Sequence, residues 1–240
     1  MKIINLGNRI MNTYLYKAPC GYVMIDTGYE HSLESVQKKL AKWGLQLDDI
    51  RYVFLTHAHD DHAGFLKELL EKTTNLRVIA SGKALPTLNA GQNSFTGGCS
   101  NFLAFVFCNM MALFGKGEHR FPAIGELLAH RFVFVTDENR SALEVDLGGV
   151  ILFTPGHTSD SISLKVGDVV FCGDAAMNGL PSLNRITIWV ENKVEFAYSW
   201  DTLLQSQAAT VYPAHGKPFG VTDLKKYKNR IRVRKLYPLR

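Results

Sequence analysis

The sequence predicts a layered α/β fold, and three observations lead to this prediction. Short apolar runs typical of strands alternate with amphipathic stretches typical of helices along the first third of the chain. Motifs rich in His and Asp come directly after apolar runs, where open α/β sheets place their sites. The 240 residues are 46% hydrophobic and 20% charged, an ordinary globular balance that is ample for a core.

The first third of the chain has the order of strands and helices of a layered domain. Leu33, Val36 and Leu40 recur at spacings of three and four, which predicts a helix that Gly44 ends. The turn residues Pro19-Cys20-Gly21 separate two short apolar runs and predict a hairpin. The expected elements are strands at 14–16 and 22–25, a helix at 31–43, a strand at 50–55, a helix at 63–72 and a strand at 76–80.

An insertion interrupts the alternation at about residues 81–131. Residues 91–100, rich in Gly, Asn and Ser, lead into an apolar run at 102–114. This run is too short to cross a bilayer and too uniformly apolar for an ordinary surface helix. Four interpretations stay open: a buried core helix, a lid or apolar wall over the active site, a homodimer contact, or a membrane-interface segment.

After the insertion the strand pattern returns. Gly167 and Asp168 predict a turn between two adjacent strands. Because there is no internal repeat and no linker, we expect residues 1–240 to form a single domain. The expected elements are strands at 132–135, 143–145, 150–153, 161–166 and 169–172, a helix at 193–206, a strand at 210–212 and a helix at 222–233.

A loop rich in potential metal ligands follows the apolar run at 52–55. His57 and His59 alternate, so an extended backbone would point both side chains the same way. Asp61 and His62 are adjacent, point apart, and could serve a second ion. Imidazole and carboxylate groups suit zinc and similar divalent ions. The loop therefore predicts a metal site, the alternative being a polar loop rich in histidine by chance.

Three further motifs each present one such residue after a strand. His157 follows Thr-Pro-Gly, Asp174 follows an apolar run and a glycine, and His215 follows Tyr-Pro-Ala. A single histidine at a strand end is more often a structural hydrogen-bonding group. Five of the eight histidines, however, lie in these motifs and the first loop, and this concentration favours a shared metal site.

The ordered set of these residues, with Asp26 before them, resembles the metallo-β-lactamase superfamily from about residue 3 to 220. The resemblance implies a four-layer αβ/βα sandwich, with two mixed β-sheets face to face and helices outside. It also implies two divalent metal ions, Zn²⁺ in the first place, with Fe and Mn as alternatives. Asp26 would steady a ligand loop. The implied ligands are His57, His59 and His157 for the first ion, Asp61, His62 and His215 for the second, and Asp174 as the bridge.

The activity implied by the resemblance is hydrolysis, with a hydroxide shared by two ions attacking a carbonyl or phosphoryl centre. Asp61 would orient this nucleophile and relay a proton. His59 favours a hydrolase, because the flavodiiron oxygen reductases of the superfamily usually have glutamate there. The complete ligand set and the absence of a recognisable signal peptide argue against β-lactam hydrolysis. Thr-Pro-Gly-His157-Thr is similar to glyoxalase II and the lactonases, but the residues after His215 are too few for a glutathione-binding domain.

The apolar run favours a small carboxylic ester, lactone or thioester with an apolar group as substrate. The alternative is a phosphodiesterase or nuclease that uses the basic C-terminal segment, 222–240, as an anion grip, although nucleic acid is not the expected partner. A non-heme iron oxygenase is a more distant alternative. The side chains expected to contact substrate are Phe102, Phe105, Phe107, Met110, Met111 and Phe114.

Composition indicates a cytoplasmic protein. Its four cysteines are scattered without a Cys-x-x-Cys motif, so we expect reduced thiols and no disulfides. Residues 1–16 have scattered charge and no long apolar segment, so no signal peptide is expected. The net charge of +5 is concentrated at the C-terminal end, most simply as a solvated face.

Overall fold

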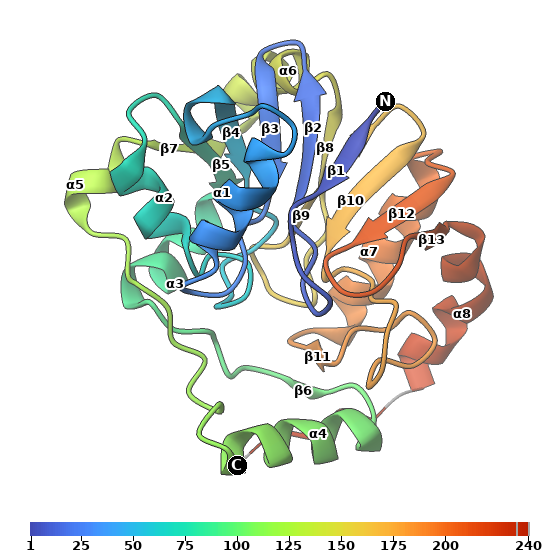
Figure 1. The fold of residues 1–240 in the computed structure, drawn as a ribbon. Coiled ribbons are helices and arrows are strands. Elements are labelled where there is room, and N and C mark those ends of the chain that lie inside the picture. Colours follow the sequence, from blue (N-terminus) through green and yellow to red (C-terminus); the bar gives the residue numbers. More distant parts are fainter. Residues whose placement is uncertain (234, 240) are drawn as a thin grey trace. The chain divides into compact units, whose positions relative to one another are not determined.

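The computed structural model describes residues 1–233 and 235–239 (Figure 1). The chain forms two compact units, the first made of Met1–Asn93 and Arg120–Val150, the second of Ser94–His119 and Ile151–Arg240. The middle of the expected insertion therefore belongs to the second unit and its ends to the first. Arg234 and Arg240, part of the expected basic C-terminal segment, lie outside the described residues.

The first unit has a six-stranded mixed sheet in the order β1-β2-β3-β4-β5-β7. The pairs β1–β2 and β2–β3 are antiparallel, and the strands from β3 to β7 are parallel neighbours. Parallel strands bring their carboxyl ends to one edge of the sheet. The strands are β1 Ile3–Asn5, β2 Tyr14–Ala18, β3 Gly21–Ile25, β4 Ile50–Phe54, β5 Arg77–Ser81 and β7 Phe132–Val135.

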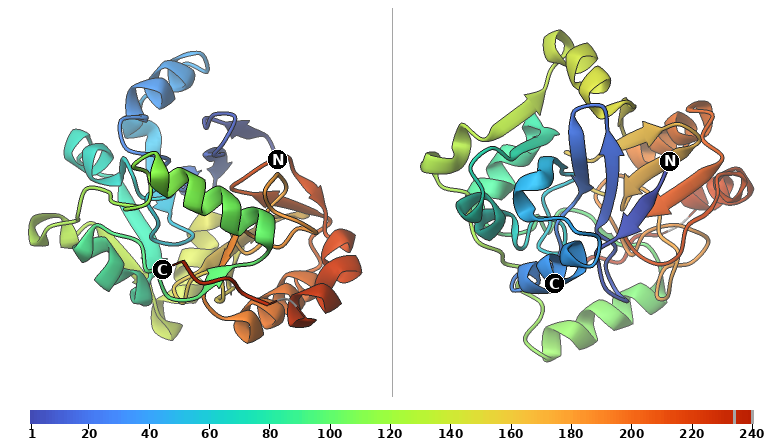
Figure 2. Two further views of the ribbon diagram at one scale, coloured as in Figure 1. Left: turned by 90° about the horizontal axis from the view of Figure 1, so that it is seen from below. Right: turned by 45° about the horizontal axis from the view of Figure 1, so that its top comes forward.

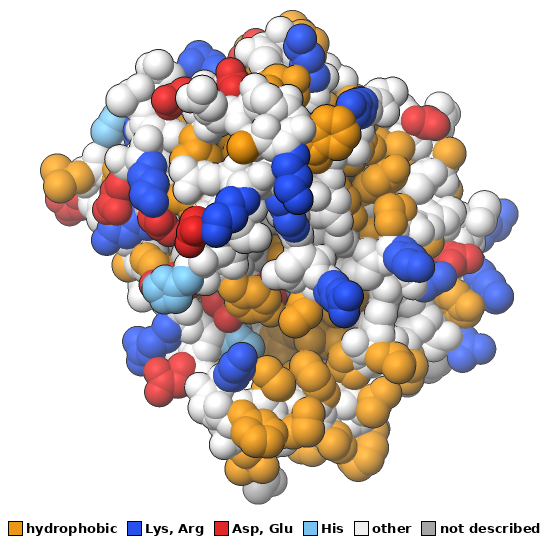
Figure 3. Space-filling model, viewed as in Figure 1, with side chains coloured by type: hydrophobic (Ala, Val, Ile, Leu, Met, Phe, Trp, Pro, Cys, Tyr) orange, Lys and Arg blue, Asp and Glu red, His pale blue; other side chains and the backbone are white. Residues whose placement is uncertain are grey.

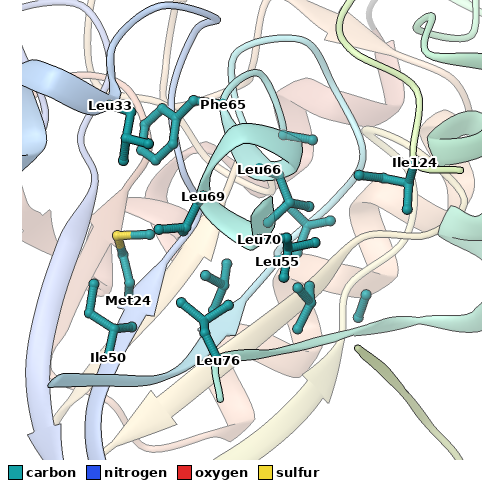
Figure 4. Close-up of a cluster of buried hydrophobic side chains, with 14 of the residues drawn as sticks. Met24, Leu33, Ile50, Leu55, Phe65, Leu66, Leu69, Leu70, Leu76 and Ile124 are labelled. Atoms are coloured by element: carbon teal, nitrogen blue, oxygen red, sulfur yellow. The ribbon is translucent and has the colours of Figure 1, made fainter. Parts of the chain in front are cut away.

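Helices of this unit pack apolar side chains into a core with the sheet residues. Leu33, Leu66 and Leu69 are fully buried there with Met24 and Phe65 (Figure 4). The helices are α1 Leu33–Ala41, α2 Leu66–Lys72, α3 Leu85–Ala90, α5 Glu126–Ala129 and α6 Asp137–Leu147, with 3₁₀ turns at Leu47–Asp49 and Gly82–Ala84.

The strand predicted at 143–145 is wrong, because these residues lie inside α6. The side chain of Thr136 accepts a hydrogen bond from the Asn139 N–H at 3.4 Å, and the Asn139 side chain accepts one from the Thr136 N–H at 2.9 Å. This reciprocal cap begins the helix. Gly148, at φ 61°, ends it, and Leu143 and Leu147 are buried one turn apart.

The second unit has its own mixed sheet in the order β13-β12-β10-β9-β8. The strands β9 and β10 form the expected antiparallel hairpin, and β10 pairs with β12 in parallel. Trp200 on α7 is fully buried in the core of this unit. The elements are β6 Gly98–Cys99, α4 Phe102–Leu113, β8 Val150–Phe153, β9 Ile162–Val166, β10 Val169–Gly173, β11 Trp189–Val190, α7 Lys193–Gln205, β12 Thr210–Pro213, β13 Phe219–Gly220 and α8 Thr222–Val233.

The apolar run at 102–114 forms α4, and its interpretation as a buried core helix is wrong. Ala104 is the one buried residue in this helix. Phe102 is 62% exposed and Leu113 is 87% exposed. Among the described residues, no helix combines the length and the apolar character needed to cross a membrane.

The core of the first unit generates a prediction about stability. Changing Leu69→Ala removes a fully buried side chain and leaves a cavity, so we expect a loss of about 2–5 kcal/mol in the free energy of unfolding. The control Leu127→Ala alters a leucine that is 89% exposed and should change that free energy by less than about 0.5 kcal/mol. Guanidinium denaturation measures both values. Equal losses would contradict the assignment of Leu69 to the core.

Candidate metal-binding residues

In the first unit, the loop after β4 is tied to the end of β3 by a buried carboxylate. The two strands are parallel neighbours, so Asp26, directly after β3, lies beside the start of the loop. Its Oδ1 accepts a hydrogen bond from the Thr56 N–H at 2.7 Å, and its Oδ2 accepts one from the Thr56 hydroxyl at 2.8 Å. Asp26 thus fixes the backbone at the first residue of the histidine-rich loop.

The same carboxylate orients His62. Nδ1 of His62 lies 2.8 Å from Asp26 Oδ2, a hydrogen bond that assigns the proton to Nδ1. Nε2 of this buried ring then carries the lone pair that a metal ligand needs. The His62 carbonyl accepts hydrogen bonds from the backbone N–H and the hydroxyl of Thr27, so both the ring and the backbone are held.

Ligand-type atoms of the loop lie close together within this unit. Those of His57 and His59 are within 4.8 Å of each other, as are those of Asp61 and His62. The distance from His62 Nε2 to Asp61 Oδ1 is 3.7 Å. This distance is too long for a hydrogen bond. It is close to the separation, roughly 3.4–3.6 Å, of two atoms that bind one ion at about 2.1 Å each.

Asp60, between His59 and Asp61 in the loop, forms two hydrogen bonds with Asn93. Its Oδ1 accepts a hydrogen bond from the Asn93 side-chain amide at 2.7 Å, and its backbone N–H donates to Asn93 Oδ1 at 2.8 Å. The side chain of Asn93 therefore braces the middle of the loop, a contact that the sequence analysis missed.

In the second unit, a turn at the end of β8 presents His157. Gly156 has φ 125°, and a Cβ there would lie 2.2 Å from the backbone nitrogen of Phe196, so only glycine fits this approach of the turn to α7. Nδ1 of His157 lies 2.8 Å from the carbonyl oxygen of Trp189. As with His62, this contact leaves Nε2 as the ligand-type atom.

Asp174 and His215 follow β10 and β12, which are parallel neighbours. Asp174 Oδ2 lies 3.8 Å from Nε2 of His157, and Asp174 Oδ1 lies 3.6 Å from Nε2 of His215. One carboxylate therefore has an imidazole near each oxygen at a distance suited to a shared ion. Gly216, at φ 87°, allows the chain after His215 to pass the carbonyl of Asn178, where a Cβ would clash.

A carboxylate also lies near the turn of His157. Glu191 Oε2 accepts a hydrogen bond from the Ser159 N–H at 2.8 Å. Burial raises the pKa of Glu191, although this hydrogen bond opposes the shift. Glu191 thus fastens the residues that follow His157 and was not among the predicted site residues.

The donor set fits divalent metal ions. The nitrogen and oxygen donors suit Zn²⁺, Fe and Mn. Two imidazoles in different units each have Nδ1 at 2.8 Å from an oxygen, the hydrogen bond that orients metal-binding histidines. The Trp189 acceptor is a backbone carbonyl, which no residue type could have revealed. The role of Thr56 could have been predicted, because this residue directly precedes His57 and its hydroxyl can donate a hydrogen bond to a carboxylate.

Among the described residues, the groups of possible metal ligands do not include the other three histidines, His31, His119 and His130. His31 precedes α1, and its side chain is 87% exposed. His119 lies beside Phe95, with ring centroids 6.2 Å apart. His130 is exposed at the end of α5.

The chain matches the family model of the metallo-beta-lactamase superfamily over residues 6–215. A metallo-beta-lactamase fold-containing protein from Sulfurisphaera tokodaii is 28% identical over 158 residues, 64% of this chain and 52% of the relative. The probable metallo-hydrolase YqjP from Bacillus subtilis is 24% identical over 222 residues, 85% of this chain and 66% of the relative. The chain thus spans about half to two thirds of the length of these curated relatives.

Solved structures show the same fold. A metallo-beta-lactamase with an HARLDQ motif mutation from Cronobacter sakazakii matches with a TM-score of 0.68 and 20% identity, over 96% of this chain and 88% of that one. The protein TTHA1623, solved in a di-iron-bound form, matches with a TM-score of 0.64 and 21% identity, over 94% of this chain and 98% of that one. These matches confirm the expected metallo-β-lactamase fold, an α+β sandwich of mixed sheets with helices.

The hydrogen bonds of Asp26 generate a prediction about metal binding. Asp26→Asn keeps the size of the side chain but replaces one acceptor oxygen with an NH₂ that faces donors. We expect the affinity for Zn²⁺ to fall by about 10- to 100-fold, the usual effect of losing a residue that orients a ligand. Competition with a chromophoric chelator measures this affinity.

Asp60→Asn is the matched control, because asparagine keeps an oxygen that can accept from the Asn93 amide. Its affinity for Zn²⁺ should stay within about twofold of the original protein, since Asp60 is not an expected ligand. Equal affinities of the Asp26 variant and the original protein would contradict the orienting role of Asp26.

Proposed function

The chain belongs to the metallo-beta-lactamase superfamily, and from that membership we propose that it is a hydrolase that uses two divalent metal ions. The observation that carries this proposal is the paired orientation of His62 and His157. Each ring has its Nδ1 at 2.8 Å from a fixed oxygen, so each has Nε2 prepared to bind a metal. Such preparation has little use in a histidine that serves only as a structural hydrogen-bonding group.

The proposed ligand set follows the order of residues typical of the superfamily. Asp174 is proposed as the bridge because both its oxygens lie 3.6–3.8 Å from histidine Nε2 atoms. The pairing of Asp61 with His62 at 3.7 Å supports their assignment to one ion. We assign His57, His59 and His157 to the first ion, and Asp61, His62 and His215 to the second, with Asp174 shared.

When bound, the two divalent ions would lower the pKa of a shared water towards about 7 and polarise the oxygen of a carbonyl or phosphoryl group. The chain's own residues prepare this chemistry. Asp26 and the Trp189 carbonyl hold imidazole protons at Nδ1, and the resulting fixed ring orientations limit reorganisation during the reaction. We propose Asp61 as the group that orients the nucleophile and relays a proton to the leaving group.

A small carboxylic ester, lactone or thioester with an apolar group is the substrate class that we propose. The support comes from α4, whose aromatic and methionine side chains are exposed or half-buried rather than used up in a core. Phe105, Phe107 and Met111 are half-buried and are the proposed contacts for the apolar group, ahead of the more exposed Phe102, Met110 and Phe114. The printed name of the Bacillus subtilis relative, a probable metallo-hydrolase, agrees with the reaction class.

Phosphodiester hydrolysis is the second candidate. It is supported by Lys225, Lys226, Lys228 and Arg230 on α8, which could attract an anionic substrate. Zinc is the proposed metal. The di-iron form of TTHA1623 supports iron as the alternative for this donor set, and elemental analysis of the purified protein decides between them.

The proposal predicts a metal-dependent esterase activity that His57 supports. Hydrolysis of p-nitrophenyl butyrate and of a fluorogenic lactone should disappear after chelation and return with added Zn²⁺. His57→Ala should lose at least one of two metal equivalents, and kcat/KM should fall about 100-fold or more. Bis-p-nitrophenyl phosphate, assayed in parallel, tests the second candidate.

His31→Ala is the matched control, because His31 is an exposed histidine outside every motif. It should retain two metal equivalents and the original kcat/KM. Full turnover in the His57 variant with both metals retained would refute the proposed site, whereas activity only on the phosphodiester would overturn the substrate class alone.

A further inference from the structure

The outward side of α4 is an apolar surface exposed to solvent. Phe102, Val106, Met110 and Leu113 recur at spacings of four, four and three, and so lie along one side of the helix. Each is at least 45% exposed. Figure 3 shows hydrophobic side chains gathered over the region where Figure 1 places α4. We call Phe102, Leu103, Val106, Met110, Leu113 and Phe114 the α4 face.

No charged residue occurs between Phe102 and Phe114. The one strongly polar side chain among the exposed positions, Asn109, donates a hydrogen bond to the carbonyl of Phe105 at 2.8 Å. Because its amide already has a partner within the helix, its transfer into an apolar medium is less costly. The α4 face can therefore leave water along its whole length.

Contacts within the second unit hold the start of α4 and the side on which Phe105 lies. Asn101 caps the helix by accepting from the Ala104 N–H at 2.9 Å, and its amide donates to the Pro181 carbonyl at 3.2 Å. Tyr237 contacts the rings of Phe102 and Phe105, with centroids 6.2 and 5.9 Å apart, and the C-terminal segment lies beside β6 and α4 (Figure 2). An isolated helix at a membrane surface has a polar face opposite its apolar face. In this protein the rest of the second unit, instead of a polar face, lies behind the apolar side of α4.

The net charge of the chain lies in the same unit. The second unit has 13 Lys and Arg residues against 8 Asp and Glu residues, and the first unit has 14 of each. Basic residues concentrate on α8 and continue to Lys235, two residues before the tyrosine that contacts α4. A partner of this unit should therefore offer both an apolar medium and negative charge.

We propose that the α4 face docks on an anionic lipid bilayer, with its apolar side chains in the boundary between headgroups and acyl chains. The interior of the bilayer supplies the apolar medium, and its negatively charged surface attracts the Lys and Arg side chains close to it. Docking of this kind needs no helix that spans the membrane. It also does not depend on the proposed hydrolase activity.

A second copy of the chain is a poorer occupant of this face. One side of a 12-residue helix, roughly 18 Å long and 10 Å wide, offers on the order of 200 Å². A stable interface buries about 800 Å² on each partner. Self-association through α4 would also bring two basic C-terminal segments towards each other, and their repulsion opposes it.

Vesicle sedimentation of the intact protein tests this docking. The original protein should bind vesicles of phosphatidylcholine with 30% phosphatidylserine. Its binding should weaken at least fivefold when the salt concentration rises from 0.05 to 0.5 M. These two concentrations lie on either side of 0.1 M, where charges are screened over roughly 10 Å. Leu113→Glu places a charge on the α4 face and should reduce the partition coefficient about tenfold or more. Far-ultraviolet circular dichroism checks that the variant remains folded.

Leu127→Glu is the matched control, because Leu127 is 89% exposed, against 87% for Leu113, and lies on α5 in the first unit. It should bind vesicles like the original protein. No binding to the anionic vesicles, or equal binding by both variants, would overturn the proposal. A stable dimer in analytical ultracentrifugation that Leu113→Glu dissociates would overturn it in favour of self-association.

Discussion

A buried carboxylate, Asp26, is the group on which the geometry of the histidine-rich loop depends. Removing a charge from water costs several kcal/mol, so this residue is tolerated only with partners. It has three: the Thr56 N–H, the Thr56 hydroxyl and the His62 ring. Meeting that requirement forces the chain to leave β4 in one direction and turns Nε2 of His62 away from Asp26. The hydrogen bonds that stabilise the buried charge of Asp26 therefore also fix the orientation of the His62 ring.

The same logic governs the second unit, with backbone geometry in place of a charge. The carbonyl of Trp189 orients His157, but it can do so only because Gly156 lets the turn approach α7 closely. Neighbouring parallel strands, β10 and β12, then present Asp174 and His215 side by side. Each unit therefore prepares its own set of donors through contacts inside that unit. Preorganisation of this kind limits the entropic cost of binding an ion.

Sequence reasoning recovered what residue identity and spacing determine. Most strands and helices, and the residues with ligand chemistry, could be located because an apolar run followed by His or Asp is a local feature. The strand predicted at 143–145 was wrong because the alternation of Leu143, Glu144 and Val145 is too short to define a period, and the cap between Thr136 and Asn139 decides for the helix. The Trp189 carbonyl and the pairing of Asp60 with Asn93 were beyond reach, since a backbone acceptor has no residue signature and a contact across 33 positions leaves no local pattern.

The composition of α4 does not show which of its side chains would contact a bilayer and which would contact a substrate. Their exposure divides them into two groups. An apolar surface in water favours association or aggregation, so an exposed apolar helix indicates a surface that binds a partner or a membrane. Phe102, Met110 and Leu113 point outward with the α4 face, whereas Phe105 and Met111 are half-buried on the other sides of the helix. A bilayer would contact the first group, and the apolar group of a substrate could be held by the second. Leu113 belongs only to the first group, because it is not among the residues proposed to contact substrate.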